Sequence, residues 1–255
     1  MQFSTTQLAW IQAMLDDYAL LGTEATDRCG AMFLRNLDAP TRHLANHVRR
    51  VRHGAEDDIE AFMATLDEHY GDLGFRAVYT DWFTPPPIEA RLLADGYDCT
   101  TNLVMATDTP LHGGPSTLDG IELRAVSHDS PALAALFEVE HGDVWREWWV
   151  LEQRRGDAYT HLVAFEGEQP VGHLSYRVKG TLANIETVFT RTEQRHRGIA
   201  TALLHRADAE ARVAGATTLC LYTRADETAK DLYRRLGFEP AFTTRLYHRT
   251  VEALP

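Results

Sequence analysis

One stretch, Ile185 to Leu204, constrains the fold of this chain more than any other. Its first residues, Ile185 to Phe189, are mostly β-branched or aromatic and lack helical spacing, which predicts a strand. Apolar residues then recur at helical spacing, at Ile199, Leu203, Ala207 and Ala211. The sequence therefore predicts a strand, a short turn and a helix in direct succession.

The turn between this strand and helix is basic and contains a glycine, in the order Arg195-His196-Arg197-Gly198. The first N–H groups of a helix have no intrahelical partner, and the helix dipole favours negative charge there. A guanidinium donates two parallel hydrogen bonds to a phosphate. The turn therefore suits an anion such as a phosphate. The alternative is a plain helix cap with two solvated arginines.

A second group of elements follows at close spacing. Thr218 to Thr223 reads as a strand, a short helix carries Ala229, Leu232 and Tyr233, and Thr243 to His248 reads as another strand. This series resembles the Gcn5-related N-acetyltransferase (GNAT) family, whose pattern is a strand, [RQ]-x-x-G-x-[GA], a helix, a strand and A-x-x-L-Y-x-x-x-G-F. Here these motifs read Arg195 to Ala200 and Ala229 to Phe238, and the resemblance covers roughly Leu118 to Arg249.

The resemblance implies an α/β fold with a mixed, mostly antiparallel sheet flanked by helices. The family splits two neighbouring parallel strands to admit the pantetheine arm of acetyl-CoA. The remaining elements fit this order. We expect strands at Gly120 to Val126, Tyr159 to Gly167 and Pro170 to Val178, and helices at Asp129 to His141 and Asp143 to Arg154.

Composition limits the remaining classes. A chain of 255 residues with 44% hydrophobic residues is long enough for two domains. It has no apolar run of about eighteen residues and no apparent signal peptide, so we expect a cytoplasmic protein without a membrane segment. The net charge of −12 disfavours nucleic acid and suits a cationic substrate, although it also serves solubility. The three cysteines are too scattered for a disulfide framework.

The first half of the chain predicts a helix at Thr5 to Leu21 and a possible strand at Cys29 to Leu37, while His43 to Val51 fits either type. His43 and His47 have a spacing that could hold a metal on a helix, but no third ligand lies nearby. A solvated basic face is the better interpretation, and we predict no metal site.

Landmarks in the two halves repeat at nearly constant separation, which predicts an internal duplication. Arg52-His53-Gly54, a helix from Glu56 to Tyr70 and the strand Arg76 to Thr80 correspond to the later turn, helix and strand. The first copy carries Ala55-Glu56-Asp57-Asp58 at its helix start, and these carboxylates would repel a pyrophosphate. We therefore expect two tandem GNAT-like domains, a degenerate one at residues 1–108 and an acetyl-CoA-binding one at residues 118–255, joined by a linker at residues 109–117.

The resemblance assigns acetyl-CoA as the cofactor, with CoA as the product. The expected contacts are the turn, the helix start and the strand edge before them: Val188, Phe189, Thr190, Arg195, His196, Arg197, Gly198, Ile199, Ala200 and Thr201. His196 stands where many members have Gly. Asp226 stands where the family often has Asn, so its contact with the cofactor is in doubt.

The resemblance also assigns the chemistry. Tyr233 matches the family tyrosine whose phenol can protonate the departing thiolate, and its alternative role is packing between helix and sheet. A protonated amine must lose a proton before it attacks, and Glu186, on the strand before the turn, is the candidate base. As a strand residue, Glu186 could equally face solvent.

Family members bind the acceptor between the first two helices and the last strands. Those helices here carry Glu138, Glu140, His141, Asp143, Trp145 and Trp149, a mixture that suits a cationic amine or simply packs on the sheet. The leading hypothesis is an acetyl-CoA-dependent N-acetyltransferase for a small polar amine, for example an aminoglycoside-like antibiotic, acting as a monomer or homodimer. A catalytically silent acyl-CoA-binding scaffold and a protein or peptide N-acetyltransferase are the alternatives.

Overall fold

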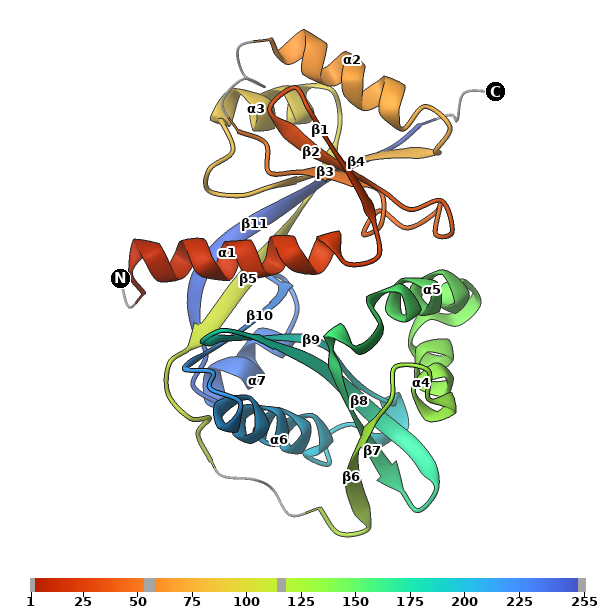
Figure 1. The fold of residues 1–255 in the computed structure, drawn as a ribbon, viewed down its shortest axis with the longest axis vertical. Coiled ribbons are helices and arrows are strands. Elements are labelled where there is room, and N and C mark those ends of the chain that lie inside the picture. Colours follow the sequence, from red (N-terminus) through yellow and green to blue (C-terminus); the bar gives the residue numbers. More distant parts are fainter. Residues whose placement is uncertain (1–2, 53–57, 114–117, 252–255) are drawn as a thin grey trace. The chain divides into compact units, whose positions relative to one another are not determined.

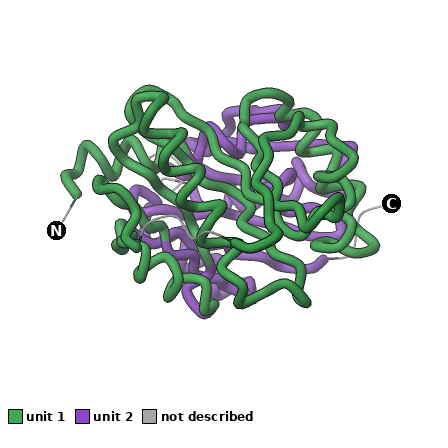
Figure 2. Tube along the Cα trace, turned by 90° about the horizontal axis from the view of Figure 1, so that it is seen from below, with its two compact units in different colours: residues 1–14, 104–223, 227–241 green, residues 15–103, 224–226, 242–255 purple. Residues whose placement is uncertain are grey.

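The structure is a computed structural model that describes residues 3–52, 58–113 and 118–251. The chain forms two compact units (Figure 2). Unit 1 comprises residues 1–14, 104–223 and 227–241, and unit 2 comprises residues 15–103, 224–226 and 242–255. Each unit is discontinuous in sequence, whereas the predicted division at residues 1–108 and 118–255 is linear. Four elements pass from one unit into the other: α1 (Thr5–Leu20), β5 (Asp98–Thr107), β10 (Thr218–Arg224) and β11 (Glu239–Thr250).

Unit 1 contains a mixed sheet in the order β5-β10-β9-β8-β7-β6 (Figure 1). Its strands besides β5 are β6 (Ile121–Val126), β7 (Thr160–Glu166), β8 (Gln169–Lys179), β9 (Leu182–Thr190) and β10 (Thr218–Arg224). Its further helices are α4 (Pro131–His141), α5 (Trp145–Arg155), α6 (Ile199–Val213) and α7 (Ala229–Arg235), with short 3-10 turns η1 (Gly142–Val144), η2 (Gly156–Ala158) and η3 (Thr192–Gln194). Strands β6 to β9 pair antiparallel, and β9 pairs with β10 in parallel.

Helices α4 and α6 cover opposite faces of this sheet (Figure 1). Successive residues of a strand point to opposite faces. On β8, the Tyr176 hydroxyl donates to Glu210 of α6 at 2.8 Å, whereas the His173 ring stacks on Phe137 of α4 with ring centroids 5.3 Å apart. From Gly172 onward, odd-numbered residues of β8 therefore face α4, and even-numbered residues face α6.

Unit 2 contains a second mixed sheet, in the order β1-β2-β3-β4-β11. Its elements are β1 (Glu24–Arg28), β2 (Ala31–Arg35), β3 (His47–Arg49), α2 (Ile59–His69), β4 (Phe75–Thr80) and α3 (Pro86–Ala94). β3 and β4 pair in parallel around α2, just as β9 and β10 pair in parallel around α6. The predicted class of fold, mixed sheets flanked by helices, is confirmed in each unit.

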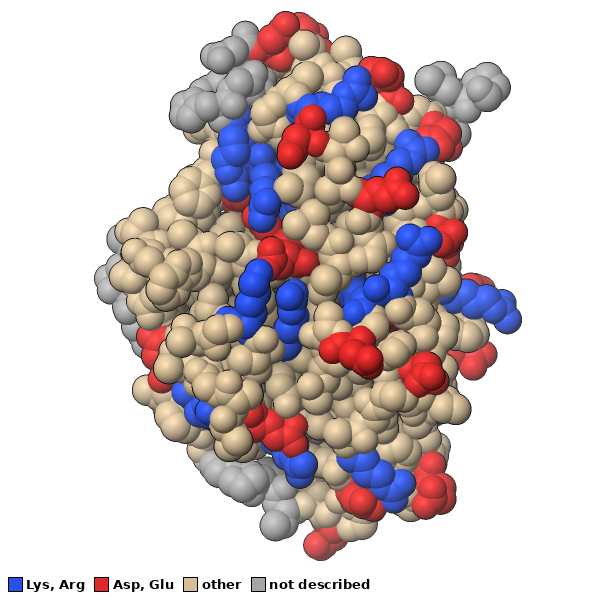
Figure 3. All heavy atoms as spheres, viewed as in Figure 1, with Lys and Arg blue, Asp and Glu red and all other residues tan. Residues whose placement is uncertain are grey.

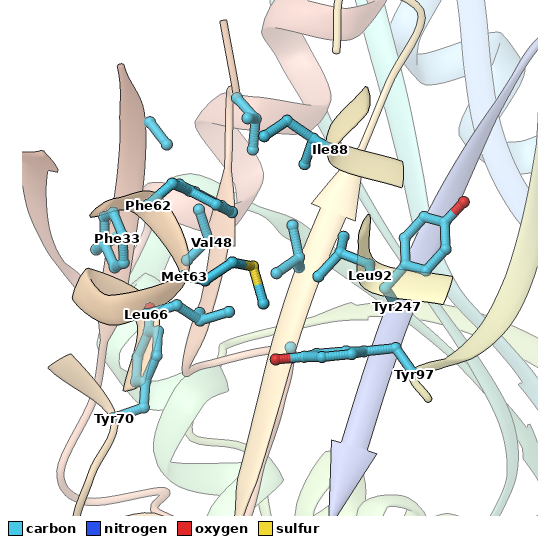
Figure 4. Close-up of a cluster of buried hydrophobic side chains, with 14 of the residues drawn as sticks. Phe33, Val48, Phe62, Met63, Leu66, Tyr70, Ile88, Leu92, Tyr97 and Tyr247 are labelled. Atoms are coloured by element: carbon cyan, nitrogen blue, oxygen red, sulfur yellow. The ribbon is translucent and has the colours of Figure 1, made fainter. Parts of the chain in front are cut away.

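The core of unit 2 lies between its sheet and the helices α2 and α3 (Figure 4). Phe62 and Leu66 of α2, Ile88 and Leu92 of α3, and Phe33 of β2 are fully buried and point toward one another. Burying one such side chain stabilises the fold by about 1.5–3 kcal/mol. This unit therefore has a hydrophobic core of its own.

The largest departures from the predicted elements lie at turns. The strand expected from Cys29 begins at Ala31, because Cys29 (φ 48°) and Gly30 (φ 67°) form the turn between β1 and β2. The sequence did not predict β1, because its residues, EATDR, are mostly exposed and lack apolar alternation. The segment His43 to Val51, for which the sequence allowed a strand or a helix, contains the strand β3. The helix expected at Asp143 begins at Trp145. It is preceded by the short turn η1, whose first residue, Gly142, has a positive φ.

Two expectations fall partly outside the described residues. They are the first-copy turn and helix start, at His53 to Asp57, and the second half of the linker, at residues 114–117. On the face shown in Figure 3, basic and acidic side chains are interspersed on the surface. None of the helices in the described part of the chain has the length and apolarity needed to cross a bilayer.

Gly172 on β8 provides a test of the packing in unit 1. A Cβ at this position would lie 2.8 Å from the Phe189 carbonyl oxygen of β9 and 3.1 Å from Cγ2 of Ile199. Gly172→Ala should therefore lower the free energy of unfolding by about 1–3 kcal/mol, as overpacking does, in denaturant titrations. Gly74→Ala is the matched control, because its Cβ meets only the Val251 carbonyl, at 3.8 Å. Equal losses in the two variants would contradict this account.

Candidate active site

The predicted basic turn connects β9 to α6. Gly198 is the N-cap of α6 with φ 82° and ψ 5°, in the left-handed region that glycine adopts without strain. His196, two residues earlier, has φ 64°. Among the described residues, no side chain caps α6, and its first intrahelical bond runs from the Ala202 N–H to the Gly198 carbonyl. The N–H groups of the first turn are therefore left for another acceptor.

A pocket of about 690 Å³ lies at this turn, entirely within unit 1. Its lining residues come from the end of β9, the turn, the start of α6 and α7: Val188, Phe189, Thr190, Gln194, Arg195, His196, Gly198, Ile199, Ala200, Thr201, Thr228, Ala229, Asp231, Leu232, Tyr233 and Arg235. Its volume lies within the usual range for small-molecule sites. Most of the predicted cofactor contacts and the predicted acid Tyr233 thus line one pocket.

Two of the predicted cofactor residues do not line this pocket. The Arg197 guanidinium pairs with Glu166 at 2.8 Å and also donates to Gln194. Asp226 accepts two hydrogen bonds from Arg224, at 2.8 and 3.1 Å. Neither ion pair is visible in the sequence, because each requires a particular side-chain direction.

Arg235 is a pocket residue that the sequence reasoning missed. It ends α7, lines the pocket and has no carboxylate within ion-pair distance in the described part of the chain. Arg195 is likewise unpaired with carboxylates among the described residues, and its Nε donates to the Thr190 carbonyl at 3.3 Å. The signal for Arg235 was its place two residues after Tyr233 in the second motif.

Tyr233 is buried in the pocket wall, with its ring edge against Phe238 at a centroid distance of 6.0 Å. Burial, with a smaller contribution from Glu227, raises the pKa of Tyr233 to about 12. The phenol therefore keeps its proton throughout the neutral range. Within the described residues its hydroxyl makes no hydrogen bond, which leaves it available to a ligand in the pocket.

β9 carries an irregularity directly before the pocket. The pairing of β8 with β9 shifts register between His173 and Ser175, so that three residues of β9 span two of β8. Thr187 has φ 48° at this point, an unusual value for a β-branched residue. Such strain costs about 1–3 kcal/mol and is concentrated at functional sites. Val188, the next residue, lines the pocket.

Glu186 lies on the other side of this bulge and is 5% exposed. It opposes Ser175 of β8, and therefore lies on the sheet face that α4 covers. The sequence left open whether Glu186 faces solvent, and the structure buries it.

The predicted substrate residues of α4, η1 and α5 have mixed environments, and none lines the pocket. Glu140 binds Nε2 of fully buried His173 at 2.9 Å, and His141 stacks on Trp148 at 4.6 Å. Trp149 packs edge-on against Phe137 at 5.6 Å, and Trp145 lies 5.3 Å from the Arg146 guanidinium. Glu138 and Asp143 are exposed. Packing therefore accounts for Trp149, and the contact with His173 accounts for Glu140, while Glu138 and Asp143 are exposed to a ligand.

The histidines considered for a metal site lie in unit 2. Burial, assisted by His248 and Arg42, lowers the pKa of His43 to about 4. His47 is buried, and its Nδ1 lies 2.9 Å from the His43 carbonyl oxygen. Across the described residues, no group of three or more His, Cys, Asp or Glu side chains is arranged to hold a metal ion.

Comparison with known proteins agrees with this geometry. Residues 124–238 match the model of the acetyltransferase (GNAT) family. A GCN5-related N-acetyltransferase from Kribbella flavida is 18% identical with a TM-score of 0.66, over 94% of this chain and 95% of that one. A tandem GNAT protein from the clavulanic acid biosynthesis pathway is 17% identical with a TM-score of 0.61, over 88% and 79%.

A functionally unknown conserved protein from Staphylococcus epidermidis is also similar, with 14% identity and a TM-score of 0.67 over 91% of this chain and 96% of that one. No curated protein sequence matches significantly. At these identities the solved structures establish the fold. Residues 124–238 form a domain of the acetyltransferase (GNAT) family, a family of acyltransferases.

Two glutamates of α4 give a direct test of the roles assigned to this helix. Glu140→Ala should lower the free energy of unfolding by about 1–3 kcal/mol, because it leaves Nε2 of buried His173 without its partner. Glu138→Ala is the matched control on the same helix and should change stability by less than about 0.5 kcal/mol, as exposed positions do. Thermal and denaturant unfolding would check both values. A loss at Glu138 as large as that at Glu140 would contradict the assignment.

Proposed function

We propose that the chain transfers an acetyl group from acetyl-CoA to a primary amine of a small, polar, cationic molecule. The observation that carries the proposal is a pocket in which three features meet. They are the start of α6 without a side-chain cap, Arg195 and Arg235 without a carboxylate partner (both among the described residues), and the protonated Tyr233. Family membership gives the reaction class, and these residues suit its two needs, an anion site and a proton donor.

The pocket suits the cofactor because its anionic part requires a locally basic site in a protein of net charge −12. The N–H groups of Ile199, Ala200 and Thr201 lie in the first turn of α6 and favour a phosphate. Arg195 and Arg235 supply the charge. Arg197, predicted for this role, is engaged by Glu166, so we propose Arg235 in its place.

The edge of β9 from Val188 to Thr190 lies in the same pocket and suits the extended pantetheine arm through backbone groups. When bound, acetyl-CoA supplies a thioester carbonyl and a thiolate leaving group. In the proposed reaction the amine nitrogen bonds to the acetyl carbon and the carbon–sulfur bond breaks. Tyr233 gives its proton to the sulfur, and Glu186 takes the proton of the amine.

The cationic class of acceptor rests on charge. Glu138 and Asp143 are exposed carboxylates on α4 and η1, and the net charge of the chain is −12. Opposite charge raises the local concentration of a cationic substrate. Which amine is accepted, an aminoglycoside-like antibiotic or another small molecule, is a question for a substrate panel.

We also propose that unit 2 is a degenerate copy that binds no acetyl-CoA. Its helix α2 is capped by Asp58, whose carboxylate accepts from the Ala61 N–H at 2.8 Å, whereas α6 has no such cap among the described residues. Arg52 makes two hydrogen bonds to Asp81, at 3.0 and 2.9 Å. A phosphate would meet a carboxylate at the helix start and an arginine already engaged.

Calorimetric titration with acetyl-CoA tests the pocket. One site per chain is expected, and Arg235→Glu should weaken binding at least about tenfold, because it places a carboxylate beside the phosphates. Arg234→Glu is the matched control, since Arg234 carries the same charge on the same helix but pairs with Asp231 and does not line the pocket. Two sites per chain would overturn the account of unit 2. Equal losses in both variants would overturn the role of Arg235.

Thiol release in the presence of a panel of small amines tests the chemistry. Tyr233→Phe should lower kcat by about 10²–10⁴-fold, the usual contribution of a general acid, and leave acetyl-CoA affinity unchanged. Because the pKa of Tyr233 is about 12, kcat in the wild type should show no loss from phenol ionisation below about pH 10. Acetyl-CoA binding without turnover of any amine or peptide would favour the silent scaffold. Turnover of peptides alone would favour a peptide acetyltransferase.

A further inference from the structure

Asn184 is a fully buried amide on β9, two residues before Glu186 and on the same face of the strand. Its Nδ2 donates to Oε1 of Glu186 at 2.6 Å. Both side chains lie away from solvent, with Asn184 0% and Glu186 5% exposed. A charge-assisted hydrogen bond of this length in a buried site is strong, because little water competes with it.

The orientation of the Asn184 amide follows from its partners. An ionised carboxylate only accepts hydrogen bonds, so the NH₂ end of the amide must face Glu186. The carbonyl end then faces β10, where the Cys220 thiol donates to Oδ1 at 3.7 Å. Cys220 is paired with Asn184 in the parallel register of β9 and β10. The amide is thus held from both sides, and it holds Glu186 in turn.

The groups around Glu186 are mostly uncharged. Burial raises the pKa of Cys220 well above its usual value, and the Glu186 charge raises it further. Burial and then Glu186 likewise raise the pKa of Tyr159, while Asn184, Arg155 and Arg177 lower it. Across the strand, Ser175 opposes Glu186. The thiol of Cys220 and the phenol of Tyr159 therefore stay neutral, and Arg155 and Arg177 are cations that act on Tyr159.

We propose that Asn184 is a positioning residue for the proposed acetyl transfer, which directs the Glu186 carboxylate so that it accepts the proton of the amine. The inference rests on the proposed function. Nothing in the sequence motifs points to Asn184, and the proposed role rests on its hydrogen bond to Glu186 and on its complete burial.

The sign of the effect follows from the contact. Donation from an amide favours the charged carboxylate and lowers its pKa, whereas a second carboxylate at the same place disfavours charge and raises it. Asn184→Asp should therefore move the acid limb of kcat/KM upward by about one pH unit or more. Asn184→Ala removes the donor without adding charge and should move it less in the same direction. The KM for acetyl-CoA should stay unchanged in both.

Asn46→Asp is the matched control. Asn46 of unit 2 is also buried, and its Nδ2 donates to the Ala39 and Arg42 carbonyls at 2.8 and 3.1 Å. The same substitution there should lower stability yet leave the pH profile unchanged. A comparison of the two variants separates the cost of a buried carboxylate from an effect on the base.

The pH profiles of kcat/KM are measured with the amine that the wild type acetylates, alongside melting temperatures. Glu186→Gln should abolish the acid limb in the same experiment. If the wild type is active and both Asn184→Asp and Asn184→Ala keep the acid limb of the wild type, the inference is overturned and the proposed function stands. A wild type that binds acetyl-CoA and acetylates no amine would overturn the proposed function itself. If Asn184→Asp does not fold, Asn184→Ala decides the inference alone.

Discussion

The left-handed turn at Gly198 is the constraint on which the candidate site depends. With φ 82°, Gly198 ends the turn and starts α6 with no capping side chain among the described residues. The chain thereby places β9 and the first turn of α6 on one pocket, which α7 completes with Tyr233 and Arg235. A side chain with a Cβ would be strained at this φ, and a capping side chain would occupy the N–H groups that an anion needs.

A related local arrangement in unit 2 differs at the helix start. There α2 also lies between two parallel strands, but Asp58 caps its start. One carboxylate is enough to satisfy a first-turn N–H group and to repel a phosphate. The two helix starts thus differ in whether a side chain already occupies a first-turn N–H group. Arg52 nearby is engaged by another carboxylate of unit 2, Asp81.

Burial divides the acidic residues near the candidate site into different roles. Glu166 and Glu140 are each engaged by a basic side chain, Arg197 and His173, and Glu186 is held by the Asn184 amide. Glu138 and Asp143 are exposed. Carboxylates that look equivalent along the chain therefore differ in environment, and the buried Glu186 needs a partner whereas an exposed carboxylate does not.

The sequence by itself determined the strand, the basic turn, the start of α6 and the helix with Tyr233, because these are local patterns read over a few residues. It also determined the mixed fold of the GNAT domain. Only the tertiary structure decided that Arg197 forms an ion pair with Glu166, that Arg235 lines the pocket and that Asn184 donates a hydrogen bond to Glu186. The physical reason is that these outcomes depend on side-chain direction and burial. The partners of such contacts come from different elements, as with Arg197 and Glu166, or from one face of a strand, and residue spacing does not reveal either.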